Sequence, residues 1–206
     1  DTDSDTVQWR ARPLADLSNR IIDTGSLKNT DRVSTWGLES MWVHGPFKLQ
    51  GEYMDSTTSR YNSAAGDFSG SAGYVSALWN ITGETWGYKG GTPTTPLPNE
   101  PASGMWQLGL RYDTIDLNDG TIVPGTTAPK VVGALGGKMD SWTFGVNWYW
   151  RSNFKFMLNY VKVDSSKFIG TTSATYANDP ANNNVAFNRV VDDNPDILEA
   201  RVQFYW

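Results

Sequence analysis

The chain has 206 residues, no cysteine and a net charge of −5, with 39% apolar residues. This length predicts a single domain over residues 1–206. The lack of cysteine excludes disulfides and thiolate metal sites, and the acidic balance argues against a nucleic-acid binder, whose footprint is usually basic. No apolar run approaches the roughly 18 residues of a transmembrane helix. Because the sequence begins at Asp1 with no signal segment, we expect a processed form or a fragment.

Ten Trp, nine Tyr and eight Phe, with 20 Gly and 10 Pro, predict an all-β chain with many turns. The last ten residues carry the clearest strand pattern. Counting back in twos from Trp206 gives an apolar residue each time as far as Leu198, and the residues between are mostly polar. A tilted strand of about 9–11 residues is long enough to cross the hydrocarbon core of a membrane.

Eight segments have strand-like alternation. They are Thr6–Pro13, Asp31–His44, Phe47–Ser56, Gly73–Gly83, Gly104–Leu117, Ser141–Arg151, Phe154–Val161 and Ile197–Trp206. In the first of them, Trp9 and Ala11 share one face. The register of Asp31–His44 is not fixed by the pattern, because both of its faces carry bulky apolar residues.

The connections are short on one side and long on the other. Turns near 44–46 and 151–153 are short, whereas the loops 14–30, 57–67, 118–139 and 165–192 are long; the Pro-rich stretch 84–103 is a long connection on the short side. Aromatic residues gather beside the short turns: Trp42, Phe47, Trp106, Trp148, Trp150, Phe154, Phe204 and Trp206. Together these features predict an antiparallel up-and-down transmembrane β-barrel with an aromatic girdle.

Several stretches also carry a family resemblance. They are Trp42–Met54, Gly73–Val75 with Thr82–Glu84, Trp106–Tyr112, Asp116–Gly120, Gly136–Gly137, Thr143–Tyr149, Phe156–Val161 and Asp193–Leu198. In combination the sequence resembles the phosphate-selective porins O and P of Gram-negative bacteria. The resemblance implies an outer-membrane porin, a sixteen-stranded wall, passive diffusion of small anions such as phosphate, contact with lipid or detergent, and a possible homotrimer.

The eight predicted strands correspond to the C-terminal half of that pattern, so the inward-folded constriction loop and most anion-selecting basic residues of the family are missing. The difference matters, because an eight-stranded barrel is filled by its own side chains, whereas sixteen strands leave an aqueous channel. We therefore expect half of a larger pore. The alternatives are a small closed structural membrane barrel without transport, or a soluble β-sandwich that binds glycans through its Trp rings.

Seven cations lie on the faces predicted to line the pore. They are Arg10, Arg12, Lys48, Arg111, Arg151, Lys155 and Arg201, set against three acids, Glu52, Asp113 and Glu199. A ladder of guanidinium and ammonium groups attracts anions, and Arg offers a bidentate fork to phosphate. The alternative is that these cations only pair with the three acids in a polar interior.

No enzyme, cofactor or metal site is predicted. The only histidine, His44, lies beside a turn and has no serine partner suggested by the pattern. The acidic clusters at 1–5 and 192–196 lack the spacing of a calcium loop.

Overall fold

The computed structural model describes residues 5–15, 18–123, 130–169, 189–204 and 206. Every regular element in these ranges is a strand, which confirms the all-β prediction. The strands are β1 (Thr6–Val7), β2 (Arg10–Ala11), β3 (Ile22–Asp23), β4 (Leu27–Lys28), β5 (Thr30–His44), β6 (Phe47–Arg60), β7 (Phe68–Asn80), β8 (Gly87–Lys89), β9 (Thr92–Thr94), β10 (Met105–Val123), β11 (Lys130–Trp150), β12 (Phe154–Ile169), β13 (Arg189–Asp192) and β14 (Asp196–Phe204). This part of the chain contains no helix long and apolar enough to cross a membrane.

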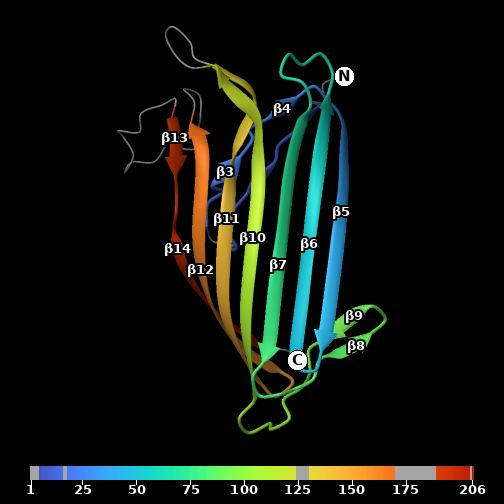
Figure 1. Cartoon of the computed structure of the whole chain (residues 1–206). Coiled ribbons are helices and arrows are strands. Elements are labelled where there is room, and N and C mark those ends of the chain that lie inside the picture. The colour runs from blue at the N-terminus through green and yellow to red at the C-terminus, as the bar shows by residue number, and fades with distance from the viewer. Residues whose placement is uncertain (1–4, 16–17, 124–129, 170–188, 205) are drawn as a thin grey trace.

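One curved, antiparallel, eight-stranded sheet dominates the molecule (Figure 1). Its order is β5, β6, β7, β10, β11 and β12. The outer edge of β12 then pairs with two strands: β14 along residues 154–162 and β13 along residues 166–169. Wall strands that neighbour one another in space also follow one another along the chain, as an up-and-down barrel requires. Over the described ranges the sheet stays open, with β5 at one edge and β13 and β14 at the other.

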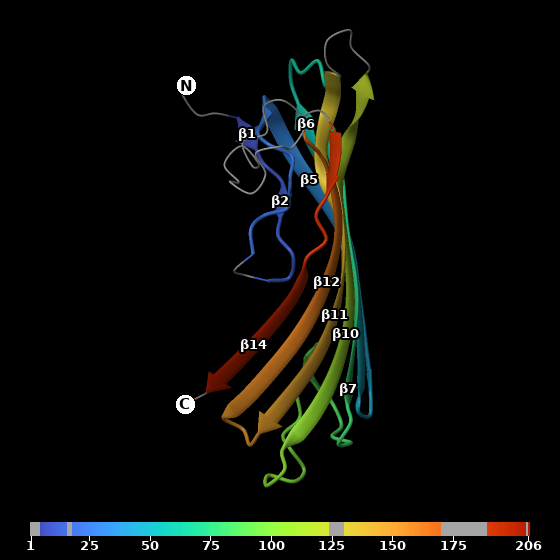
Figure 2. The same ribbon diagram turned by 90° about the vertical axis from the view of Figure 1, so that its left-hand side faces the viewer.

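The N-terminal segment, residues 5–29, departs from the prediction. β1 pairs with β4, and β2 with β3, as two short ribbons that lie on the concave side of the sheet (Figure 2). The predicted wall strand Thr6–Pro13 is therefore wrong, and the loop predicted over 14–30 supplies the partners of these ribbons. Trp9 and Ala11 pack against a buried cluster on that side, formed by Ile21, Ile22, Leu27, Phe68, Leu117, Ala134, Met139, Val161 and Val163. Local alternation could not show that this apolar face points inward.

The strands at the long-loop end run further than predicted. β10 and β11 stay paired from Met105–Tyr149 as far as Val123–Lys130, so most of the loop predicted over 118–139 is a hairpin. Its polar, Gly-rich composition concealed this pairing. Much of the loop predicted over 165–192, and most of the acidic cluster at 1–5, lie outside the described residues.

The convex face carries the apolar side chains that the alternation assigned to it. Leu38 is 70% exposed and Leu110 41% exposed, although both are aliphatic. Six residues of the predicted girdle and one further ring, Trp79, lie at the short-turn end of this face. We call this set the turn-side collar: Trp42, Phe47, Trp79, Trp106, Trp148, Phe154 and Phe204. The predicted Trp150 and Trp206 lie beyond it, nearer the chain turns. Several rings of the turn-side collar contact one another, with centroids 5.0–5.8 Å apart.

A second belt of aromatic rings crosses the same face further along the strands. This loop-side collar consists of Trp36, Tyr53, Tyr112, Trp142 and Tyr160, and includes the ring pairs Trp36–Tyr53 at 5.6 Å and Tyr112–Trp142 at 4.9 Å. On each of these strands the two collars are six residues apart, as in Trp106 and Tyr112. Six residues span about 20 Å of strand. Because strands of membrane barrels tilt by about 35–45°, both collars fit within an apolar band about 25 Å tall, toward its two borders.

Candidate functional site

The concave face between the collars is lined by the polar residues that alternate with the convex ones. Near the short turns, three amide side chains from neighbouring strands form a ladder. Asn147 Nδ2 donates to Gln107 Oε1 at 2.8 Å, and Gln107 Nε2 donates to Asn80 Oδ1 at 2.8 Å. Asn80 Nδ2 then donates to the carbonyl of Glu84 at 2.8 Å. Since Asn80 and Gln107 are buried, the ladder satisfies their amides and ties the wall to the connector that follows β7.

That connector is the long connection predicted on the short-turn side. It carries the β8–β9 hairpin at the lower end of the sheet (Figure 1). Its Trp86 is fastened to the β5–β6 turn, because the backbone N–H donates to the Gly45 carbonyl at 2.9 Å and Nε1 donates to the Pro46 carbonyl at 3.2 Å. The Lys48 ammonium lies 5.6 Å from the centroid of the Trp86 ring. The connector therefore meets the concave face at its turn end.

Arg111 on the concave face is held by a carboxylate and by an aromatic ring. Its Nε donates to both carboxylate oxygens of Asp113 at 2.9 Å, and Nη2 donates to Asp113 Oδ1 at 2.5 Å. The two residues are two apart on β10 and so share a face. The guanidinium also stacks on the Tyr74 ring, 3.9 Å from its centroid. Stacking and bidentate pairing fix the position of this positive charge.

Lys48 and Arg111 are brought together, because both line one cavity of about 300 Å³ on the concave face. Arg151 and Lys155 line a second cavity of about 220 Å³ at the turn end, beside Pro96. The Lys155 ammonium is 4.7 Å from the centroid of Tyr149. Arg201 is exposed on the edge strand β14. These five predicted cations thus lie in separate groups along the concave side and its turn end.

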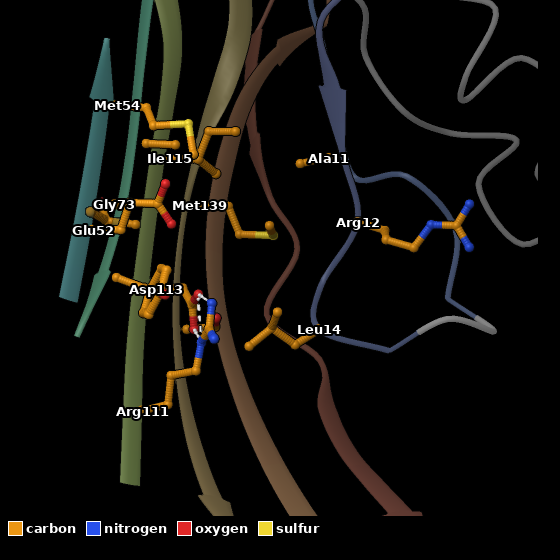
Figure 3. A pocket seen from close by; sticks show the side chains of 14 residues that line it. Ala11, Arg12, Leu14, Glu52, Met54, Gly73, Arg111, Asp113, Ile115 and Met139 are labelled. Atoms are coloured by element: carbon orange, nitrogen blue, oxygen red, sulfur yellow. Dashed lines mark hydrogen bonds and ion pairs between the residues drawn. The ribbon is translucent and has the colours of Figure 1, made fainter. Parts of the chain in front are cut away.

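The other two predicted cations, Arg10 and Arg12, lie on the N-terminal segment and not on the wall. A cavity of about 280 Å³ separates this segment from the wall, and Arg12, Arg111, Met54 and Ile115 are among the residues that line it. In Figure 3 the guanidinium of Arg12 points away from the wall. The segment therefore places positive charge out from the wall on the concave side.

Hydrogen bonds hold the N-terminal segment in place. Trp9 Nε1 donates to Thr58 Oγ1 on β6 at 3.0 Å, across 49 residues of sequence. Tyr61 donates its hydroxyl to Asp5 at 2.5 Å, and this bond raises the pKa of the phenol. Beyond the loop-side collar, burial lowers the pKa of Lys167, and the nearby Asp23 carboxylate opposes that change. The segment is thus anchored at several points of its length.

Comparison with known proteins identifies the kind of wall that this sheet forms. The family model "Phosphate-selective porin O and P" matches residues 2–206. The chain belongs to this porin family. It is 33% identical over 136 residues to Porin O of Pseudomonas aeruginosa, covering 65% of the chain and 30% of that protein. It is also 32% identical over 168 residues to an uncharacterised protein of Caulobacter vibrioides, covering 79% of the chain and 31% of that protein.

The predicted family is therefore confirmed, and with it a place among outer-membrane proteins of Gram-negative bacteria. Membership points to a channel rather than an enzyme. In the part of the porin that the structure describes, no three His, Asp or Glu side chains gather as a metal site would need. The chain spans about a third of the length of the curated relatives that it matches.

Charge alone was too narrow a criterion for finding the lining of this porin. The neutral side chains of Gln50, Thr143, Asn147 and Asn159 line the same cavity as Lys48. Their signal was already in the sequence, since each alternates with apolar residues of the convex face. What the sequence did not reveal is the pairing of strands that gathers them around one cavity.

Proposed function

We propose that this chain forms part of the wall of an outer-membrane pore through which small anions, phosphate among them, diffuse passively. The observation that carries the proposal is the difference between the two faces of one sheet. The convex face is apolar and flanked by aromatic collars, as lipid requires. The concave face carries fixed cations, which attract anions into a water-filled passage.

The balance of charge on the concave side supports anions over cations. Alongside Lys48 and Arg111 stand Lys155 and Arg201 on the wall, and Arg12 on the N-terminal segment. The acids of the wall are Glu52, Asp113 and Glu199, together with Glu39, whose backbone pairs with Glu52 and whose carboxylate accepts a bond from Gln50. The N-terminal segment adds Asp5 and Asp23, which accept bonds from Tyr61 and Gln8. Arg111 and Asp113 neutralise each other, whereas among the described residues no carboxylate lies within ion-pair distance of Lys48, so its positive charge remains available to the passage.

We propose further that strands from outside this chain complete the wall. Both edges of the sheet present backbone groups that would otherwise lack partners in a membrane. The matches cover only 30% and 31% of the curated relatives, which leaves room in those proteins for a further half-wall. On this proposal residues 1–206 are a single domain, the C-terminal half of a sixteen-stranded porin, and the assembled porin is a trimer.

The competing function is a closed structural barrel without transport. The buried cluster between the N-terminal segment and the wall favours it, because this cluster fills the concave side at the loop end. The cavities nearer the short turns favour a passage instead. A glycan-binding sandwich is disfavoured, because six of the ten Trp rings are spread in two belts over the convex face and not gathered in a groove.

Planar-bilayer conductance tests the proposal. We expect the folded porin to give a stable current whose reversal potential in a potassium chloride gradient has the sign of anion selectivity, and we expect added phosphate to reduce it. An intact, detergent-folded sample that gives no current would favour the structural barrel. A cation-selective current would contradict the assignment of the concave cations.

A further inference from the structure

The cavity of about 280 Å³ between the N-terminal segment and the wall has apolar side chains that remain open to water. Met54 on the wall is 42% exposed, and Leu14 on the segment is 41% exposed. Figure 3 shows Leu14 directed from the segment toward the wall. Both residues lie on the concave side, away from lipid. A cavity lined by apolar groups that water reaches is a common feature of sites for small organic ligands.

The register of the sheet explains this apolar lining. One row of paired residues crosses β6, β7, β10 and β11 and lines the cavity: Met54, Ala72, Ile115 and Met139. We call this row the apolar shelf. Because Ala72 stands between Met54 and Ile115, its short side chain leaves room between the two longer ones.

A carboxylate lies beside the apolar shelf. Glu52 precedes Met54 by two residues on β6, so their side chains share a face and stand about 7 Å apart along the strand. Both residues line the cavity. Among the described residues, no cation lies within ion-pair distance of Glu52. Glu39, whose backbone pairs with Glu52, adds a second negative charge on the neighbouring strand.

The charges around the cavity favour a cationic group at this place. Arg111 is neutralised by Asp113, whose two carboxylate oxygens accept bonds from its Nε. The guanidinium of Arg12 points away from the wall (Figure 3). The carboxylate of Glu52 is therefore the charge that faces a ligand on the apolar shelf. An ammonium group would meet an acceptor there, whereas an anion would be repelled.

We infer that this cavity binds a small amphipathic amine. Its ammonium group pairs with Glu52, and its alkyl chain or ring packs between the apolar shelf and Leu14. The bound amine narrows the passage beside the N-terminal segment, so it blocks the pore and is not one of the solutes that the pore carries. This site goes beyond the proposed function, because it selects a cation through apolar contact inside a passage for anions.

The test is the block of current in the full porin by a series of primary alkylammonium ions, from methylammonium to pentylammonium. We expect the half-blocking concentration to fall by up to about fourfold with each added methylene, because each one leaves water for the apolar shelf. Pentanoate has the same chain and the opposite charge. It should block only at concentrations at least about tenfold above those of pentylammonium, because it lacks the charge-assisted bond.

Two variants separate the roles of charge and space. Glu52→Gln keeps the size of the side chain and removes its charge. We expect it to raise the half-blocking concentration of pentylammonium about tenfold, because a hydrogen bond to a charged group is lost. Ala72→Leu keeps every charge and fills the room between Met54 and Ile115. We expect it to abolish the dependence of block on chain length.

Each variant has a matched control. Glu199→Gln removes a carboxylate from the concave side of β14, at the opposite edge of the sheet, and Ala77→Leu adds the same atoms to the convex side of β7. Both controls should keep the wild-type half-blocking concentrations. If Glu52→Gln and Ala72→Leu also keep them, or if pentanoate blocks as well as pentylammonium, the amine site is wrong. An anion-selective current in the same recordings would leave the proposed function standing.

A wild-type porin without anion-selective current would instead contradict the proposed function. The amine site is then measured by titration calorimetry of pentylammonium chloride into the detergent-folded porin. Heat of binding that is lost in Glu52→Gln and kept in Glu199→Gln would support the site without any current. Equal heats in wild type, Glu52→Gln and Ala72→Leu would overturn it.

Discussion

The two halves of a single wall strand follow opposite rules. On β12, the concave-side residue Asn159 lies between the collars, while Val161 and Val163, further toward the loops, are fully buried. On the convex side, Leu158 is an exposed aliphatic residue, while Asp164 beyond the loop-side collar is an exposed acid. The alternation continues without a break, but the apolar side chains change faces.

The change of faces marks the change of solvent. Between the collars the strand has lipid outside and water inside, so apolar residues belong on the convex face. Beyond the loop-side collar water reaches the outside, and the apolar residues turn inward as they do in a soluble protein. They need a cover there, which the N-terminal segment supplies through Ile22 and Trp9. The N-terminal segment therefore lies on the concave side because the wall strands turn their apolar side chains to that side beyond the loop-side collar.

A carboxylate placed on the concave side of β12 separates the halves most sharply. Val163→Asp buries a charge among Ile22, Met139 and Leu117 and should cost at least about 4 kcal/mol of unfolding free energy. Asn159→Asp, four residues earlier, should leave folding intact and weaken phosphate block. Electrophoresis without boiling distinguishes folded from unfolded porin. Equal folded fractions for both variants would remove the distinction between the halves.

The packing of the N-terminal segment against the wall can be weakened by a single substitution. Ile22 is fully buried under the loop-side half, so Ile22→Ala should destabilise the docked N-terminal segment by about 2–5 kcal/mol. Hydrogen exchange should then speed up over residues 9–24 and stay slow in β12 between the collars. Arg20→Ala, at an exposed position of the same segment, is the control and should change exchange little. Uniform acceleration throughout the sheet would mean that segment and wall open together.

The convex face should show the same boundary from outside. Leu158→Arg sets a cation in the apolar band and should cost about 2–4 kcal/mol in unfolding from lipid vesicles. Asp164→Arg places the same side chain four residues beyond Tyr160 of the loop-side collar, where water solvates it. We expect it to change the free energy of unfolding little. Equal costs at the two positions would contradict the position of the membrane boundary.

Between the two collars alternation predicted the wall strands, because lipid and water impose opposite demands on the two faces. It failed for Thr6–Pro13, since Trp9 and Ala11 alternate in the same way whether the cover is lipid or a protein core. The cavity that Lys48 and Arg111 line could not be predicted either. Two of its lining residues, Gly109 and Gly145, meet only through the register of β10 and β11, which no local pattern of residues specifies.

The smallest expected effect is a pH dependence at Lys167, on the concave side of the loop half. Burial lowers its pKa in the folded porin from the ordinary 10.5, and Asp23 opposes that change only in part. Between the lowered value and 10.5 the unfolded chain keeps a proton that the folded porin has lost, so wild-type stability should rise with pH in this window.

Lys167→Met removes the titrating group while filling a similar space, so this rise should disappear from a plot of unfolding free energy against pH. Tyr61 acts in the opposite direction, because its bond to Asp5 raises the phenol pKa and lets stability fall as pH rises above 10.0. It is present in both proteins, and the difference between wild type and Lys167→Met isolates the lysine. Parallel curves for the two proteins would mean that water reaches the Lys167 ammonium in the folded porin. The loop-side half of the concave face would then be hydrated like the half between the collars, which would contradict the difference in solvent between them.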